Sequence, residues 1–157
     1  MRHAVTVYSQ GAANIIQAAK KHALRRLVAV TSMATLNESA PGETWFFRTV
    51  MDPILLRMGR TVYADMARME RTMADSGLDW TVIRPAGLFD GKVVTGYRFV
   101  TEHPAGRFTS RTDLADALVR TATEELHIGQ CVNVVTNEGA PRSCGCSSVR
   151  PCTSGTD

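Results

Sequence analysis

Apolar residues recur along this chain with two periods, one typical of helices and the other typical of buried strands. Residues 11–23 and 61–76 carry apolar side chains three or four positions apart, which predicts two amphipathic helices. Residues 27–32 are apolar on both alternating faces, and residues 80–83 form a short β-branched run, as in parallel strands covered by helices. Each helix precedes a strand, so the pattern predicts an α/β fold.

The second half of the chain continues this alternation with shorter elements. Residues 97–100 and 108–109 are expected as short strands, and residues 131–135 as the last one. A helix over residues 113–124 would be capped by Ser110 or Thr112. We therefore expect a three-layer α/β sandwich with a mostly parallel sheet over residues 1–136, followed by a disordered tail over residues 137–157, which is rich in Ser, Gly, Pro and Thr.

An apolar stretch at residues 45–58 interrupts this order. Pro53 should kink or restart a helix near Asp52, because proline cannot continue a helix interior. Core packing is the commonest use of such residues, and a substrate-side cap or a partner-binding surface is the alternative.

Composition narrows the classes of function. The 157 residues include 18 basic and 15 acidic ones scattered through the chain, so the net charge of +3 predicts no face for nucleic acid or anionic lipid. No apolar run approaches the ~20 residues that cross a bilayer and no secretory segment follows Met1, which predicts a cytoplasmic protein. Three of the four cysteines lie in the tail and no histidine follows His127, so neither a disulfide framework nor a metal site is expected.

Four segments in this order resemble one enzyme family. They are residues 11–20 (GAANIIQAAK), 28–32 (VAVTS), Glu70 with 76–85 (SGLDWTVIRP), and 111–115 (RTDLA). Together they look like the atypical short-chain dehydrogenase/reductases, and most like the NAD(P)H-binding group that includes NmrA-like proteins and the flavin/biliverdin reductase type. The resemblance covers roughly residues 5–136 and implies a Rossmann-like domain that takes part in oxidoreductase chemistry.

One part of the family's pattern is missing from this sequence. Family members hold the pyrophosphate of NAD or NADP on a Gly-rich turn that follows the first strand. Residues 9–14 and 84–88 are the nearest candidates, and neither has the G-x-G-x-x-G spacing. The alignment starts near the family's fourth strand, so the resemblance implies an N-terminally truncated domain in which binding of NADP or NAD is weak or lost.

The resemblance places the nicotinamide side of the site at the ends of two strands. It assigns cofactor contacts to Thr31, Ser32 and Met33 after the first strand and to Pro85, Ala86, Gly87 and Leu88, in a loop, after the second. The alternative is that Thr31 only pairs in the sheet, Ser32 caps a turn, and proline and glycine punctuate a strand end.

Ser32 and Tyr63 are the catalytic candidates. Typical short-chain dehydrogenases place a lysine four positions after the tyrosine to lower the pKa of its phenol. Here Ala67 holds that position, and Arg68 is displaced by about 100° around the helix. Tyr63 is therefore either a catalytic acid or an ordinary helix tyrosine, and we expect Asp65 and Glu70 to be solvated or salt-bridged rather than catalytic.

Two functions from different classes fit these features. The first is hydride transfer between a nicotinamide cofactor and an unidentified small molecule, with this chain inactive if it is a fragment. The second is a non-enzymatic, NmrA-like regulatory or protein-interaction module. Without the family's first strands, residues 27–32 would form an apolar sheet edge, and such an edge predicts self-association.

Overall fold

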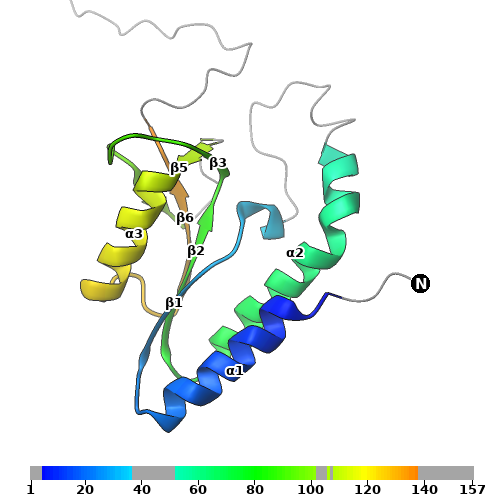
Figure 1. Ribbon diagram of the computed structural model, residues 1–157, viewed down its shortest axis with the longest axis vertical. Coiled ribbons are helices and arrows are strands. Elements are labelled where there is room, and N and C mark those ends of the chain that lie inside the picture. Colours follow the sequence, from blue (N-terminus) through cyan, green and yellow to red (C-terminus); the bar gives the residue numbers. More distant parts are fainter. Residues whose placement is uncertain (1–4, 37–51, 102–105, 107, 138–157) are drawn as a thin grey trace, which may run out of the picture.

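The computed structural model describes residues 5–36, 52–101, 106 and 108–137, and of these we describe no side chain at residues 36 or 52–58. The helices are α1 (Val7–Lys21), α2 (Asp52–Ala74) and α3 (Arg111–Thr123), with a short 3₁₀ helix, η1 (Met33–Leu36). The strands are β1 (Arg26–Val30), β2 (Asp79–Pro85), β3 (Gly87–Phe89), β4 (Arg98–Val100), β5 (Phe108–Ser110) and β6 (Gln130–Val135). These elements form three layers, in which α1 and α2 cover one face of the main sheet and α3 covers the other (Figure 1).

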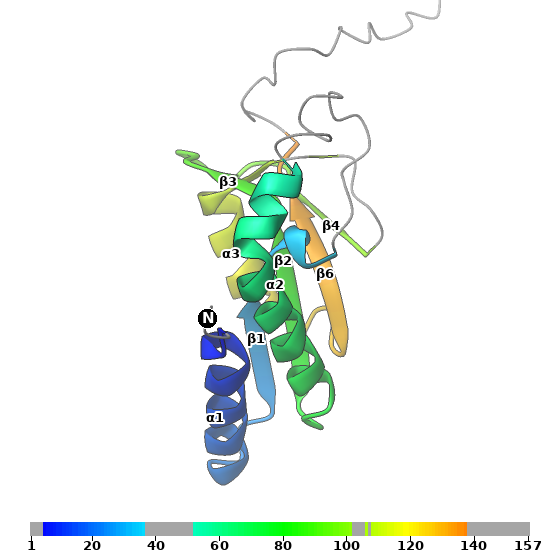
Figure 2. The ribbon, with the colours of Figure 1, turned by 90° about the vertical axis from the view of Figure 1, so that its right-hand side faces the viewer.

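The main sheet is mostly parallel, as the sequence predicts. Its strand order is β1-β2-β6-β4, with β1, β2 and β6 parallel and β4 antiparallel to β6 (Figure 2). A separate two-stranded parallel sheet pairs β3 with β5. The parallel strands all end at one edge of the molecule, where the functional residues were expected.

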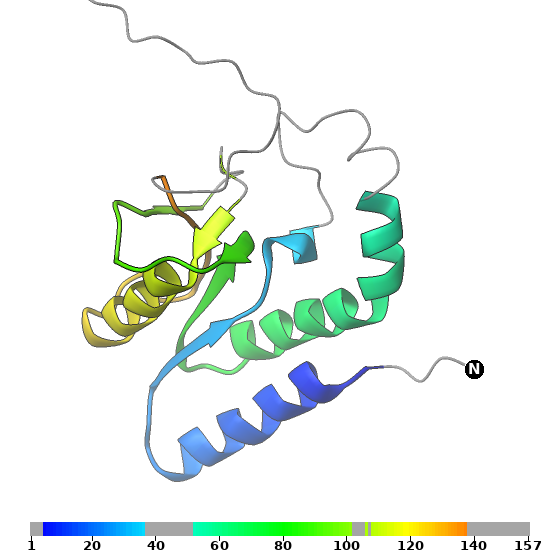
Figure 3. The same cartoon turned by 45° about the horizontal axis from the view of Figure 1, so that its top comes forward.

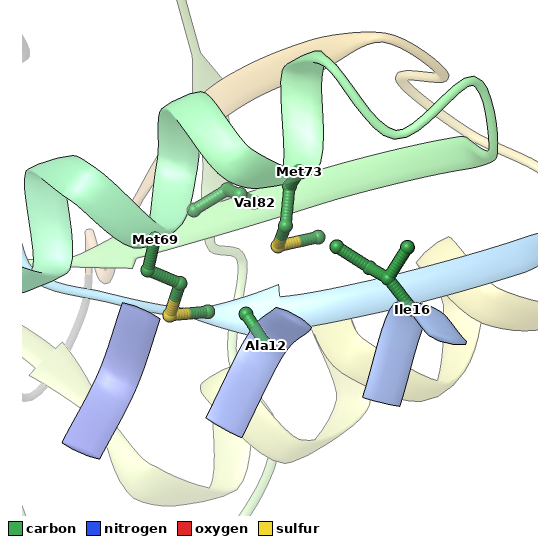
Figure 4. Close-up of a cluster of buried hydrophobic side chains, with 5 residues drawn as sticks. All are labelled: Ala12, Ile16, Met69, Met73 and Val82. Carbon is green, nitrogen blue, oxygen red and sulfur yellow. The ribbon is translucent and has the colours of Figure 1, made fainter. Parts of the chain in front are cut away.

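Two apolar layers fill the space on either side of the sheet. On one side, Ala12 and Ile16 of α1 meet Met69 and Met73 of α2 over Val82 of β2 (Figure 4). The methionine stripe of α2 is therefore core packing, as its spacing predicts. The layer on the other side packs α3 against the sheet, and its buried members are Ile83, Ala117, Val132 and Val134.

The helices differ from their predicted bounds. The helix α1 starts at Val7, four residues before the predicted start, and runs side by side with α2 (Figure 3). The helix α2 is continuous over 23 residues and begins at Asp52, where Pro53 predicts that a helix restarts, so the regular apolar spacing from Thr61 marks only its second part. Pro53 is its second residue, a place where the missing N–H costs no helical hydrogen bond. Residues 45–51 of the apolar stretch and the tail from residue 138 lie outside the described residues.

Two strand predictions also need correction. The strand β1 is half-buried rather than buried, because it is the first strand of the sheet and pairs on one side only within the described part of the chain. The segment 85–88 is not a loop. Pro85 ends β2 and pairs in register with Val134, while Gly87 and Leu88 belong to β3. No helix in the described ranges combines the length and apolar character that crossing a bilayer requires.

The N-terminus of α1 is capped by a side chain from another helix. Thr6 makes no side-chain cap, and Asp65 of α2 instead accepts the N–H of Tyr8 (2.8 Å) and the hydroxyl of Ser9 (2.5 Å). Arg68 donates to the same carboxylate at 3.1 Å. Asp65 is fully buried and paired with Arg68, so of the two roles predicted for it the salt-bridged one is confirmed and the solvated one is wrong. Burial would raise the pKa of Asp65, but these hydrogen bonds and the charge of Arg68 hold it below its ordinary value.

Asp65→Asn should lower the free energy of unfolding by about 1–2 kcal/mol at neutral pH, because the amide cannot accept the same donors. The pKa of Asp65 is lower in the folded chain than in the unfolded chain. The contribution is therefore complete above the unfolded value of about 3.9 and is lost as pH falls through the folded value. Urea unfolding from pH 7 to pH 3 measures this, with exposed Asp75→Asn as the control. Equal pH profiles for the two variants would contradict the cap.

Candidate functional site

The carboxyl ends of β1 and β2 lie together at the edge of the sheet where ligands bind in open α/β folds. The N–H of Thr31 donates to the carbonyl of Ile83 at 3.0 Å, which continues the pairing of β1 with β2 by one residue. Thr31, Ser32 and Met33 leave β1 at this point, and Ala86 leaves β2 beside them. The structure thus brings the two groups of predicted cofactor contacts to one edge.

A buried ion pair fixes this edge to α2. The guanidinium of Arg84 donates to both carboxylate oxygens of Glu70, at 3.0 and 2.6 Å, and the hydroxyl of Thr31 donates to the same carboxylate at 2.6 Å. The side chains of Arg84 and Glu70 are only 16% and 9% exposed. Glu70 is therefore salt-bridged, which is one of the two roles predicted for it. Thr31 pairs with β2 through its N–H, as the alternative to a cofactor contact predicts, but its hydroxyl binds Glu70.

The ion pair also affects the pKa values of Arg84 and of Cys131 nearby. The hydrogen bond to Glu70 raises the pKa of Arg84 against the opposing effect of burial. Half-buried Cys131 of β6 lies near both charges, and burial raises the pKa of its thiol while Arg84 opposes the rise. Cys131 packs against the apolar layer of α1 and α2, so we assign it a packing role.

Ser32 begins the turn that leads into η1. Its hydroxyl oxygen accepts the N–H of Ala34 at 3.2 Å, and its carbonyl accepts the hydroxyl of Thr35 at 2.7 Å. The predicted turn-capping role of Ser32 is therefore present. Within the described residues nothing accepts its hydroxyl proton, which leaves that proton available to a bound molecule.

The segment after β2 is fixed by a hydroxyl from β5. Thr109 is fully buried; its hydroxyl accepts the N–H of Ala86 at 2.9 Å and donates to the carbonyl of Val134 at 2.5 Å. The pairing of β3 with β5 continues this link through Gly87 and Leu88. A side chain without a hydroxyl at position 109 could not join β2, β5 and β6 in this way.

Asp113 is buried and accepts several hydrogen bonds, which the sequence did not predict. Its carboxylate accepts the N–H of Thr95 at 2.7 Å and the hydroxyls of Thr95 and Thr136. The sequence predicts only a favourable acidic residue near the start of α3. The available signal was the Ser-x-x-Asp spacing from Ser110, which marks a helix start but does not reveal burial.

Tyr63 remains separate from these contacts. It lies on α2, and its ring packs so closely over Gly59 that a Cβ added there would come within 2.5 Å of the ring. In the described part of the chain no hydrogen bond joins Tyr63 to Ser32 or to the residues after β2. The geometry therefore supports Ser32 more directly than Tyr63.

The N-termini of α1 and α3 are already occupied by side chains of this chain. Asp65 takes the N–H groups at the start of α1, and Ser110 takes those of Thr112 and Asp113 at the start of α3. A pyrophosphate needs free N–H groups at such a place. The described N-termini of α1 and α3 therefore offer no free N–H groups to the phosphates of a dinucleotide.

A hollow of about 490 Å³ lies between α1 and α2, and none of the predicted site residues lines it. Its lining consists of Ala13, Ile16, Gln17, Lys20, Thr72, Asp75 and Ser76. No group of three or more His, Cys, Asp or Glu residues within the described ranges is placed to hold a metal ion.

The fold and the position of this edge define a Rossmann-like α/β protein. A family model described as NAD(P)H-binding matches residues 2–125. The chain belongs to this NAD(P)H-binding family.

Solved structures show the same fold. A short-chain dehydrogenase/reductase from Veillonella parvula, in complex with NADP, is 19% identical with a TM-score of 0.65, covering 85% of this chain and 61% of that one. The anaerobillin reductase ChuY from Escherichia coli O157:H7 is 21% identical with a TM-score of 0.64, covering 89% and 64%. A Rossmann-fold NAD(P)-binding family protein from Shigella flexneri is 20% identical with a TM-score of 0.60, covering 93% and 63%. This chain thus spans about three fifths of the length of these structures.

Glu70→Gln should destabilise the fold by about 3 kcal/mol, because it leaves the buried guanidinium of Arg84 without its counter-charge. The double variant Glu70→Gln/Arg84→Met should cost less than the sum of the single variants. Urea unfolding followed by circular dichroism measures both.

The matched control is Arg25→Met, which breaks the exposed ion pair of Arg25 with Asp79 and should cost less than about 1 kcal/mol. If Glu70→Gln costs no more than this control, the buried pair does not hold the edge.

Proposed function

We propose that this chain forms the nicotinamide- and substrate-facing part of an NAD(P)-dependent oxidoreductase site, which transfers hydride between the cofactor and a small molecule. The observation that carries the proposal is that the ends of β1 and β2 lie together, joined by the bond from Thr31 to Ile83, in a chain of the NAD(P)H-binding family. The Veillonella structure, which has this fold, is in complex with NADP.

The residues at this edge take different parts in the proposal. Thr31 and Ala86 are held by Glu70 and Thr109, so they shape the floor of the nicotinamide site rather than react. Met33, Pro85, Gly87 and Leu88 supply backbone and apolar contacts around the ring. Since 44% of Leu88 is exposed, it remains available to a ligand.

Ser32 is the proposed catalytic residue. The bound nicotinamide would supply or accept the hydride. The hydroxyl of Ser32 would donate its proton in a hydrogen bond to the substrate atom on which negative charge develops, while Ala34 N–H holds the Ser32 oxygen in place. Tyr63 is a second candidate for this donor, on the resemblance alone.

A non-enzymatic regulatory or protein-interaction module is the second candidate function. The observation in its favour is that the N-termini of α1 and α3 are both closed by side chains, which leaves the dinucleotide phosphates without a partner there. In that role the carboxyl edge would be part of the fold without turnover. The two proposals differ in whether reduced cofactor is consumed.

Oxidation of NADPH by a quinone or flavin acceptor tests the choice. The enzyme proposal expects turnover at high NADPH concentration, and Ser32→Ala should lower kcat by about 10²-fold, the usual cost of losing one donor to developing charge. Exposed Thr123→Ala on α3 serves as the hydroxyl control and should leave turnover unchanged. Absence of turnover at any NADPH concentration would favour the interaction module, and normal turnover in Ser32→Ala would remove Ser32 from the chemistry.

A further inference from the structure

The outer edge of β1 presents backbone hydrogen-bonding groups that no described residue pairs. On its inner side, the carbonyl of Arg25 accepts the N–H of Asp79 at 2.8 Å, and the N–H of Thr31 donates to Ile83. Backbone groups of a parallel strand point to alternate sides, so Leu27 and Ala29 also face β2. The N–H and C=O groups of Arg26, Val28 and Val30 therefore point to the open edge, since β1 comes first in the strand order of the described residues.

This edge lacks the features that normally prevent pairing. Exposed edges usually carry a charged side chain, a proline or a bulge. The only charged residue of β1 is Arg26, and its guanidinium turns back to the carbonyls of Asp79, Thr121 and Leu126, at 2.8, 2.6 and 2.9 Å. Val28 and Val30 are only half-buried. Nothing on β1 therefore opposes a further strand.

Apolar side chains of α1 and of the segment before β1 are also left in contact with water. Tyr8 of α1 packs against the core layer that includes Leu27 and Ala29. Ile15 lies seven residues further along the same helical stripe, yet it is 55% exposed. Leu24, just before β1, is 61% exposed.

We propose that β1 pairs with β1 of a second copy of this chain, antiparallel and about a two-fold axis at Val28. Val28 then lies opposite Val28 of the second copy, and Arg26 lies opposite Val30. Each of these residues exchanges two N–H···O bonds with the residue opposite it. The two four-stranded sheets become one continuous sheet. This is a property of the open edge and does not depend on the proposed oxidoreductase site.

The distribution of charge selects the antiparallel arrangement. Basic residues gather at the end of α1 that adjoins the amino end of β1, at Lys20 and Lys21, whereas Arg25 is paired with Asp79 and Arg26 is turned inward. Parallel pairing of two copies would set these ends side by side, and like charges would repel. Antiparallel pairing places each basic end beside the carboxyl end of the other copy, where β1 continues into uncharged Thr31 and Ser32. The edge is therefore complementary to itself in one orientation.

Sedimentation velocity of the full chain tests the proposal through the mass of the particle. The wild-type chain should sediment with twice the monomer mass. Val28→Pro removes the outward N–H, a change that an edge strand tolerates, and should give a monomer with an unchanged circular dichroism spectrum. Val28→Ala removes side-chain volume but keeps the N–H, so it should remain a dimer. A monomeric wild-type chain, or a dimeric Val28→Pro variant, would contradict the proposal.

Amide hydrogen exchange tests the same edge without a substitution, in case Val28→Pro fails to fold. In the wild-type chain the amides of Val28 and Val30 should be protected from exchange, like those of inward-facing Leu27 and Ala29. Their protection should fall on dilution, whereas that of Leu27 and Ala29 should not. Fast exchange at Val28 and Val30 at every concentration would mean an open edge, and protection that does not change on dilution would mean that the chain covers its own edge. Either result would overturn pairing with a second copy.

Discussion

The buried ion pair between Glu70 and Arg84 is the interaction on which the rest of this structure depends. Charges that are removed from water must be paired, so the positions of the two side chains are tightly constrained. Because Glu70 also accepts the hydroxyl of Thr31, one carboxylate joins α2 to the ends of β1 and β2. The place where a ligand would meet the sheet is thereby fixed by a helix that lies on one face of it.

The helix α2 carries out three tasks with neighbouring residues. Met69 and Met73 fill the apolar layer, Glu70 holds the carboxyl edge, and Asp65 caps α1. On the opposite side of the site, Asp113 and Thr109 make the corresponding links among α3, β5 and β6. Two sets of buried polar contacts thus hold the edge from both faces of the sheet, and polar groups of this kind favour one arrangement over alternatives when all are satisfied.

The sequence predicts well those parts of the fold in which apolar residues recur at a regular local spacing. The stripe of α2 and the run before Pro85 depend only on neighbouring residues, and they give the layers and the parallel strands. Asp65 shows the limit of this reasoning, because a carboxylate on a helix looks solvated until the N-terminus of another helix is known to lie against it. The strand β3 was missed for a related reason, because a three-residue strand has no period and its partner lies 21 residues away along the chain. Residues 108–109 were predicted as a strand, but nothing local in the sequence indicates that the Thr109 hydroxyl bonds to Ala86 and Val134. For the candidate site, the resemblance located both strand ends, but only the structure showed that Thr31 is engaged by Glu70.

The central proposal is that this chain presents the nicotinamide half of a dinucleotide site, while the N-termini of α1 and α3 offer no cradle for the phosphates. Affinities for reduced nicotinamide mononucleotide and for NADPH, measured by tryptophan fluorescence or calorimetry, test this directly because the two ligands share only the nicotinamide half. The account predicts weak binding of both, with dissociation constants within about tenfold of each other, a difference of ~1.4 kcal/mol. Binding of NADPH a thousandfold tighter than the mononucleotide, or about 4 kcal/mol, would mean that the chain does hold the phosphates and would contradict the account.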